Sequence, residues 1–198
     1  MYPKSLQNLI DEFAKLPSIG PKTAERFIFH LLKRPQTDLI RLSVAIARLR
    51  DDIKLCQTCF NYDETDPCSI CSNPKRDNGI ICLVAKNQDI MAIEKTGLYS
   101  GVYHVLGGYI NPLENMMPSN IRLNELIERI KKEKPKEIIM ALNPDTEGES
   151  TSSFIIRVLK QFEGLKITRL GRGLPSGADL EYADEITMEN AISNRKEI

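Results

Sequence analysis

The stretch Ile138-Ile-Met-Ala-Leu-Asn-Pro-Asp-Thr-Glu-Gly-Glu149 joins a continuous apolar run to an acidic loop. Five apolar residues in a row, 138–142, are typical of a strand that is buried on both faces of a parallel sheet. Turn-forming residues then end the run. We therefore predict a strand over 138–142 whose C-terminal end carries the acidic loop, which is where open α/β sheets place functional residues.

Strand and helix patterns alternate on both sides of this junction. Short apolar runs predict further strands over 80–84, 103–106 and 166–170. Apolar residues at helical spacing predict helices over 88–95, 119–130 and 151–162, the second of them capped by Ser119. This alternation indicates a parallel sheet covered by helices on both faces, followed by a short helical tail.

The first 54 residues carry helical patterns only. Apolar spacing predicts helices over 6–13, 23–33 and 38–52. The first two are joined by the turn Leu16-Pro-Ser-Ile-Gly-Pro21, in which Ile19 can fill the core between them. The segment holds ten Lys and Arg residues against six Asp and Glu residues, so it carries a net charge of +4 although the whole chain is neutral.

This turn resembles the helix-hairpin-helix motif of proteins that bind DNA without reading its sequence. Backbone amides at the start of the second helix point outward with positive partial charge, and Lys22 adds a full charge beside them. Such a turn can hold a backbone phosphate without contacting a base. We expect the basic residues of this segment to contact DNA, namely Lys22, Arg26, Lys33 and Arg34. An ordinary helical connection with solvated lysines is the alternative.

Four cysteines have the spacing of metal ligands. Two C-x-x-C pairs are separated by eight residues and comprise Cys56, Cys59, Cys68 and Cys71. Two such turns present four thiolates to one point, which completes a tetrahedral Zn²⁺ site and leaves no position open for water. The sequence therefore predicts one structural zinc ion per chain, with redox cysteines as the alternative. Cys82 lies in an apolar strand and is expected to be an inert buried thiol.

The acidic loop resembles the Asp-x-Asp-x-Glu-Gly signature of the Toprim fold, which topoisomerases, primases and some nucleases share. It has Asn143 in place of the first aspartate, and Ala85 where that fold usually has a glutamate after its first strand. Both replacements remove groups that two-metal phosphodiester chemistry uses as ligand or proton carrier. The remaining carboxylates are left as a weak cation site, a docking surface for a protein or a solvated helix start: Asp145, Glu147, Glu149 and Asp89.

The order of these parts resembles the RecR family of bacterial recombination mediators. The resemblance is carried by the two cysteine pairs and by residues 16–27, 92–97, 103–108, 143–149 and 180–184. It implies a non-enzymatic clamp, a ring-shaped homotetramer, that binds single- and double-stranded DNA without sequence preference. It further implies that the clamp acts with RecO and RecF to load RecA at single-stranded gaps. By the same resemblance Lys22 and Arg26 contact phosphates, and the partner-binding residues Asp145, Glu147 and Glu149 face RecO.

We therefore expect a multidomain α/β protein of four parts. These are a helix-hairpin-helix module over 1–54, a four-cysteine zinc finger over 55–78, a Toprim-like parallel sheet over 79–172 and a C-terminal loop and helix over 173–198. No apolar run approaches the roughly 18 residues of a membrane span, and residues 1–5 lack a signal-peptide pattern. We accordingly expect no membrane partner and a cytoplasmic location. A Mg²⁺-dependent nuclease or primase, and a zinc-stabilised scaffold that never contacts DNA, are the alternative functions.

Overall fold

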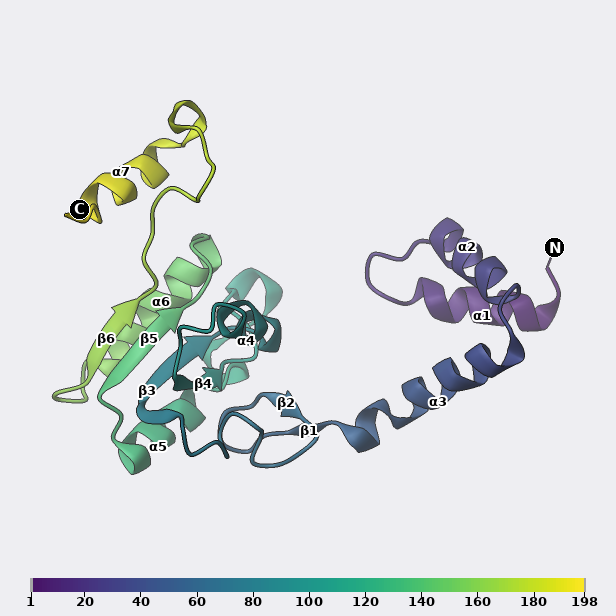
Figure 1. Cartoon of the computed structure of the whole chain (residues 1–198), viewed down its shortest axis with the longest axis horizontal. Helices are drawn as coiled ribbons and strands as arrows, with labels where there is room; N and C mark the ends of the chain where they lie inside the picture. Colours follow the sequence, from purple (N-terminus) through teal and green to yellow (C-terminus); the bar gives the residue numbers. More distant parts are fainter. Residues whose placement is uncertain (1, 198) are drawn as a thin grey trace. The chain divides into compact units, whose positions relative to one another are not determined.

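The chain divides into two compact units, one up to Ile53 and one from Lys54 onward. The computed structural model describes residues 2–197, which are traced in Figure 1. The first unit contains helices α1 to α3, and the second contains every strand of the described part. Among the residues that the structure describes, no helix combines the length and the apolar content that crossing a bilayer requires.

A four-stranded parallel sheet forms the centre of the second unit (Figure 1). Its strands are β3 (Asp77–Val84), β4 (Gly101–Val105), β5 (Glu137–Ala141) and β6 (Lys166–Arg169), in the order β4-β3-β5-β6. Val84 at the end of β3 pairs with Val105 of β4 and with Ala141 of β5. The C-terminal ends of these three strands therefore lie side by side, at the same end of the sheet. The predicted parallel α/β arrangement is confirmed.

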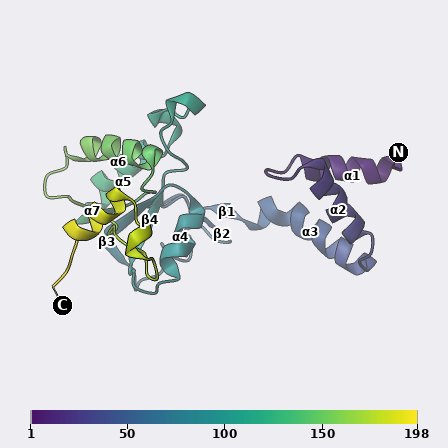
Figure 2. The ribbon, with the colours of Figure 1, turned by 90° about the horizontal axis from the view of Figure 1, so that it is seen from above.

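Helices cover both faces of this sheet, as predicted. The helices are α4 (Asn87–Glu94), α5 (Leu123–Glu133) and α6 (Thr146–Leu159). Ile81 and Leu83 of β3 pack in the core that α5 and α6 share, whereas Cys82 and Val84 pack on the opposite face with Ile90 of α4. Figure 2 shows α6 on one side of the strands and α4 on the other. Alternate residues of β3 thus serve two separate cores.

Two helices of the second unit begin elsewhere than predicted. Helix α6 begins five residues earlier, because the side chain of Asp145 accepts the backbone N–H of Gly148 and caps it. Ser119 does not cap α5: it lies in the 3₁₀ turn η2 (Pro118–Asn120), and α5 begins at Leu123. The N–H of Arg122 donates to the carbonyl of Leu106 at the end of β4, so the chain is held non-helical at that point.

A two-stranded ribbon and a partly buried ion pair border the sheet. The ribbon pairs β1 (Lys54–Leu55) with β2 (Tyr62–Asp63) in antiparallel register. Arg76 donates to a carboxylate oxygen of Glu94 at 2.9 Å and to the carbonyl of Tyr99 at 3.1 Å. The guanidinium of Arg76 lowers the pKa of Glu94, so this carboxylate stays charged and ties the end of α4 to the approach to β4.

The first unit consists of α1 (Lys4–Ala14), α2 (Pro21–Leu31) and α3 (Gln36–Asp52). Its buried residues are Ile10 of α1 with Ala24 and Ile28 of α2, and Ile19 in the connecting turn packs against them as predicted. Helix α3 has no buried residue although it is rich in leucine, isoleucine and valine. The hydrophobic core of this unit is therefore small, and it comes from the first two helices.

The C-terminal segment follows β6. It contains the 3₁₀ turn η3 (Leu180–Tyr182) and the predicted final helix, α7 (Glu185–Ser193), which Asp184 caps by accepting the backbone N–H of Thr187. None of the residues of η3 or α7 is buried.

Candidate zinc centre, acidic loop and basic hairpin

The four predicted zinc ligands lie together in the second unit. The Sγ atoms of Cys56, Cys59, Cys68 and Cys71 all lie within 4.8 Å of one another, and the first three cysteines are buried. Thiolates at about 2.3 Å from a tetrahedral zinc ion lie about 3.8 Å apart, so a single ion fits this donor set. All five cysteines of the chain are free of disulfides. The site fits one structural zinc ion per chain.

Hydrogen bonds hold the two cysteine turns in place. Asp63 accepts both the backbone N–H and the hydroxyl of Ser69, at 2.9 and 2.7 Å. Burial opposes ionisation of Cys56, but backbone N–H groups, including that of Cys68 at 3.5 Å from the sulfur, outweigh it and lower the pKa of Cys56 to about 7. In the β3 strand, by contrast, burial raises the pKa of Cys82 to about 12, which suits the inert thiol predicted there.

The four-cysteine segment over 55–78, called the zinc module from here on, also covers part of the sheet. The backbone N–H of Val105 in β4 donates to the carbonyl of Cys59 at 2.9 Å. The next residue, Phe60, packs edge-on against His104, with ring centroids 5.4 Å apart, and the guanidinium of Arg122 lies 4.9 Å from the centre of the Phe60 ring. Asn87 donates to the carbonyl of Phe60 at 2.9 Å. The ligand loop is thereby fastened to β4 and to the start of α4.

His104 takes part in this junction as a neutral side chain. Burial lowers the pKa of His104 to about 4, and its Nε2 atom lies 2.8 Å from the carbonyl oxygen of Arg122. A neutral ring can donate Nε2–H to that carbonyl. The grouping of Phe60, His104 and Arg122 was not predicted from the sequence, because its members are far apart along the chain and none belongs to a motif.

The acidic loop lies at the C-terminal edge of the sheet, but its carboxylates have separate partners. Glu147 accepts the side-chain amide of Asn111 at 2.7 Å, and Glu149 pairs with Arg172 and lies 3.6 Å from Arg169. Asp145 caps α6, as described above.

Asp89 also serves a helix start, because it accepts the backbone N–H of Lys86 at 2.8 Å at the beginning of α4. In the part of the chain that the structure describes, the four cysteines are the only grouping of three or more His, Cys, Asp or Glu ligand atoms. The loop carboxylates and Asp89 therefore do not converge on a common cation.

The backbone around the acidic loop is tightly packed, both at Ala85 after β3 and at Gly148. Ala85 is fully buried directly after β3, and its methyl group offers no proton carrier. The backbone N–H of Asn143 donates to the hydroxyl of Tyr109 at 3.2 Å. A Cβ atom on Gly148 would lie 2.0 Å from the carbonyl oxygen of Asn143, so this position requires glycine.

Two of the four predicted DNA contacts lie on α2 and two lie just beyond its C-terminal end. Lys22 and Arg26 are exposed and one helical turn apart, and Lys22 is close to the start of α2, where the backbone N–H groups lack intrahelical partners. Lys33 and Arg34 follow the other end of the helix, whose 11 residues span roughly 16 Å, and Arg26 lies near its middle. Arg34 lies 3.4 Å from Asp38, whereas Lys22 and Arg26 stand beside the hairpin turn itself.

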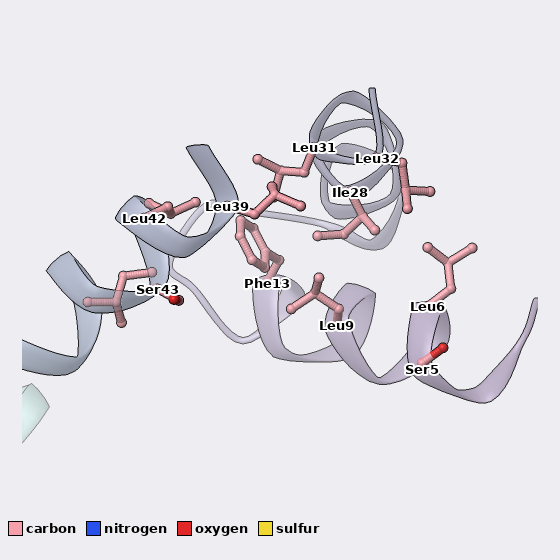
Figure 3. Close-up of a pocket in the computed structure, with 11 residues that line it drawn as sticks. Ser5, Leu6, Leu9, Phe13, Ile28, Leu31, Leu32, Leu39, Leu42 and Ser43 are labelled. Carbon is pink, nitrogen blue, oxygen red and sulfur yellow. The ribbon is translucent and has the colours of Figure 1, made fainter. Parts of the chain in front are cut away.

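An apolar groove runs between the three helices of the first unit (Figure 3). It has a volume of about 390 Å³, and its lining includes Leu9 and Phe13 of α1, Leu31 of α2, and Leu42 and Ile46 of α3. In Figure 3 the labelled side chains point into the space between the helices. Ile46 is 61% exposed, so the α3 wall of the groove is open to water.

Family comparisons agree with this arrangement of parts. Four family models match in turn: the RecR helix-hairpin-helix over 6–50, the RecR zinc finger domain with four cysteines over 53–73, the Toprim domain over 79–171, and the RecR C-terminal region over 173–196. Fold and site thus define a Toprim-fold protein that carries a helix-hairpin-helix unit and a four-cysteine zinc finger.

Curated relatives narrow this class to one family. The chain is 48% identical over 197 residues to Recombination protein RecR of Bifidobacterium adolescentis, an alignment that spans 100% of this chain and 98% of the relative. It is 46% identical over 198 residues to Recombination protein RecR of Gloeobacter violaceus, with 100% of both chains covered. The chain belongs to the RecR family of recombination proteins.

Replacement of Cys59 with serine tests the zinc centre. We expect zinc to fall from about one ion per chain to well below half, because a three-thiolate shell binds the metal far more weakly. The unfolding free energy of the second unit should fall by several kcal/mol, since metal binding contributes to folding. Elemental analysis and urea unfolding measure the two effects. Cys82→Ala is the matched control and should keep its zinc; full zinc occupancy in Cys59→Ser would contradict the assignment.

Proposed function

We propose that the chain is a non-enzymatic DNA-binding clamp that acts in recombinational DNA repair. The observation that carries this proposal is the pair of exposed cations, Lys22 and Arg26, beside the hairpin turn at the start of α2. Helix N-terminal amides and adjacent cations bind phosphate. The recombination proteins that share about half of its residues support the biological setting.

Contacts of this kind read the DNA backbone and not the bases. We propose that Lys22, Arg26, Lys33 and Arg34 all bind phosphates, and that single- and double-stranded DNA are both bound without sequence preference. Two phosphate contacts could be made at the hairpin and two at the far end of α2, since these ends are roughly 16 Å apart. That spacing favours phosphates several nucleotides apart over adjacent ones.

The acidic loop supports a role in docking rather than in catalysis. Ala85 offers no proton carrier, and Asp145 and Asp89 cap helices. Phosphodiester hydrolysis by two metals needs carboxylates that converge on the ions. We therefore propose that the chain has no nuclease or primase activity and that Glu147, with Asp145 and Glu149, contacts a basic surface of RecO.

Exposed apolar surface in the first unit supports self-assembly. Leu42 and Ile46 of α3 are 41% and 61% exposed, and both line the apolar groove. Large exposed apolar surfaces mark interaction sites. We propose that a second copy of the chain covers this surface and that the assembly is a ring-shaped homotetramer through which DNA passes.

The modular organisation and the cellular setting complete the proposal. We propose four modules, over 1–54, 55–78, 79–172 and 173–198, with zinc held by the four clustered cysteines. The clamp would act with RecO and RecF to load RecA at single-stranded gaps. It would work in the cytoplasm, where the reducing environment keeps zinc-binding thiols from forming disulfides.

Loss of the hairpin cations should weaken DNA binding. For Lys22→Ala with Arg26→Ala we expect affinity for duplex DNA to fall about tenfold or more near 0.1 M salt, and the salt slope to drop by about 1.8, since each phosphate contact contributes about 0.9. Gel-shift titrations on unrelated sequences should show the same loss. Arg157→Ala with Lys160→Ala, two exposed cations at the end of α6, is the control. Unchanged affinity in the hairpin variant would exclude these phosphate contacts.

A charge in the apolar groove should disrupt the assembly. We expect Ile46→Glu to convert a species of four times the chain mass into smaller ones, because a carboxylate cannot be buried there without a partner. Light scattering after size exclusion measures the mass. Leu113→Glu, at a side chain that is 95% exposed in the second unit, should leave it unchanged. A wild-type chain that is monomeric at all concentrations would refute the tetramer.

Neutralising Glu147 should weaken the complex with RecO. We expect Glu147→Gln to lower affinity for RecO of the same bacterium by about five- to tenfold, as for loss of one charge-assisted contact. Isothermal titration calorimetry provides the measurement. Glu163→Gln, at an exposed site after α6, serves as the control. Equal affinities of the two variants would argue against docking at the acidic loop.

A further inference from the structure

One arginine at the C-terminal end of the sheet is fixed in place but has no anionic partner. Arg122 lies between η2 and α5, and its side chain is only partly exposed. Across residues 2–197 its guanidinium forms no hydrogen bond and no ion pair, although Glu125 follows in the first turn of α5. Charged groups that are partly withdrawn from water normally have a partner of opposite charge. The charge of Arg122 is therefore left for a group from outside the chain.

The backbone and the side chain of Arg122 are both held. Its N–H donates to the carbonyl of Leu106 at 2.8 Å, and its own carbonyl lies 2.8 Å from Nε2 of the neutral His104 ring. The guanidinium carbon lies 4.9 Å from the centre of the Phe60 ring. An aromatic ring attracts a cation but leaves the N–H groups of a guanidinium without an oxygen acceptor. These donors are thus held ready for an oxyanion.

Gly107 provides the space in which the guanidinium lies. This glycine is exposed, directly after Leu106, and has a left-handed φ of 90°. A Cβ atom at this position would lie 2.6 Å from Nη1 of Arg122, so a side chain here would displace the guanidinium. Two separate features of the fold, a ring on Phe60 and the lack of one at Gly107, therefore set the position of one surface charge.

Arg122 and the acidic loop lie at the same end of the sheet. Asn111, four residues beyond Gly107, donates its side-chain amide to Glu147 at 2.7 Å. Four residues of extended chain span at most about 14 Å. An interface of standard size, about 800 Å² on each partner, would cover both the arginine and the loop.

We propose that Arg122 is a specificity-determining contact for the protein that binds the acidic loop, and that its guanidinium receives a carboxylate of that partner. Parallel N–H groups of a guanidinium match the two oxygens of a carboxylate. The proposal rests on the proposed function, in which the acidic loop meets a basic surface of RecO. It adds that this surface carries an aspartate or glutamate where it meets Arg122.

The charges near Arg122 favour a protein partner over DNA. Asp89, Asp145 and Glu147 lie at this end of the sheet, and among the described residues none of the three forms an ion pair. DNA carries negative charge along its whole length, so a duplex lying on Arg122 would also bring phosphates toward these carboxylates. A protein surface carries both signs of charge and can place an acid opposite Arg122 and a base opposite Glu147.

Isothermal titration calorimetry with RecO of the same bacterium tests the contact. We expect Arg122→Gln to lower affinity by about five- to tenfold, and Arg122→Glu to lower it further, because the partner's carboxylate would then face a like charge. Lys132→Gln, at an exposed cation in the last turn of α5, is the control and should bind as the wild type does. Wild-type affinity in Arg122→Gln overturns the proposal, as do equal affinities of Arg122→Gln and Arg122→Glu.

Displacing the guanidinium without removing its charge tests its position. We expect Gly107→Ala to bind RecO about as weakly as Arg122→Gln, and the two changes together to cause no further loss. Gly164→Ala is the matched control: its φ is 77°, and an added Cβ would have no atom within 4 Å, so the backbone is strained but no arginine is moved. Wild-type affinity in Gly107→Ala, or equal losses in the two glycine variants, would overturn the proposal.

Other roles of Arg122 give different results. Loss of zinc in Arg122→Gln would assign the residue a structural role, weaker duplex binding in gel shifts would assign it to a phosphate, and a smaller mass in light scattering would assign it to a contact between copies. Each of these results overturns the proposal. If Glu147→Gln weakens RecO binding and Arg122→Gln does not, docking at the acidic loop stands and only this inference fails. If neither variant weakens it, the proposed docking fails as well.

Discussion

The hydrogen bond from the N–H of Val105 to the carbonyl of Cys59 joins the four-cysteine loop to the central sheet, and one face of that sheet is completed across this junction. Helix α4 has eight residues and is too short to cover its face of the sheet alone. Phe60 and Ile70 of the zinc module complete that cover. A loop of so few residues has no core to hold it in shape, so a metal must do so. The ion thereby stabilises one face of the sheet as well as its own loop.

Electrostatic pairing within the chain decides what the acidic loop can do. A cation site needs several oxygens with free lone pairs directed to one point. Here each carboxylate has its own partner. Asp145 accepts a backbone N–H at the start of α6, Glu147 accepts a side-chain amide, and Glu149 pairs with two arginines. The side-chain partner of Glu147 is the neutral amide of Asn111, so among the described residues no cationic side chain pairs with this carboxylate. The carboxylates of the loop are therefore engaged separately and are not arranged to hold a metal ion together.

Local patterns were enough to predict the strands and the zinc centre, because a five-residue apolar run and a C-x-x-C turn are set by neighbours in sequence. The start of α6 was missed because 145–149 has the composition of a loop, although Asp145 and Gly148 begin a helix. The prediction that Ser119 caps α5 was wrong. The carbonyl of Leu106, which follows β4 and is distant in sequence, accepts the N–H of Arg122, and the helix begins only after this residue. For the same reason, the contacts of Phe60 could not be found in any motif. Lys33 and Arg34 lie away from the hairpin, as the predicted helix over 23–33 already required, because they lie at or just beyond its opposite end.

Gly148 illustrates how folding by itself can retain part of a signature that other proteins use for catalysis. Any side chain there would collide with the carbonyl of Asn143, and Asp145 is needed to begin α6. Selection for folding alone would therefore retain the Asp-x-x-Gly core of the acidic signature, whether or not any reaction occurs. Ala85 and Asn143 are under no such backbone constraint and are free to lose their carboxylates. In this fold, the residues that distinguish this chain from the Toprim signature, Ala85 and Asn143, are the ones outside the helix start.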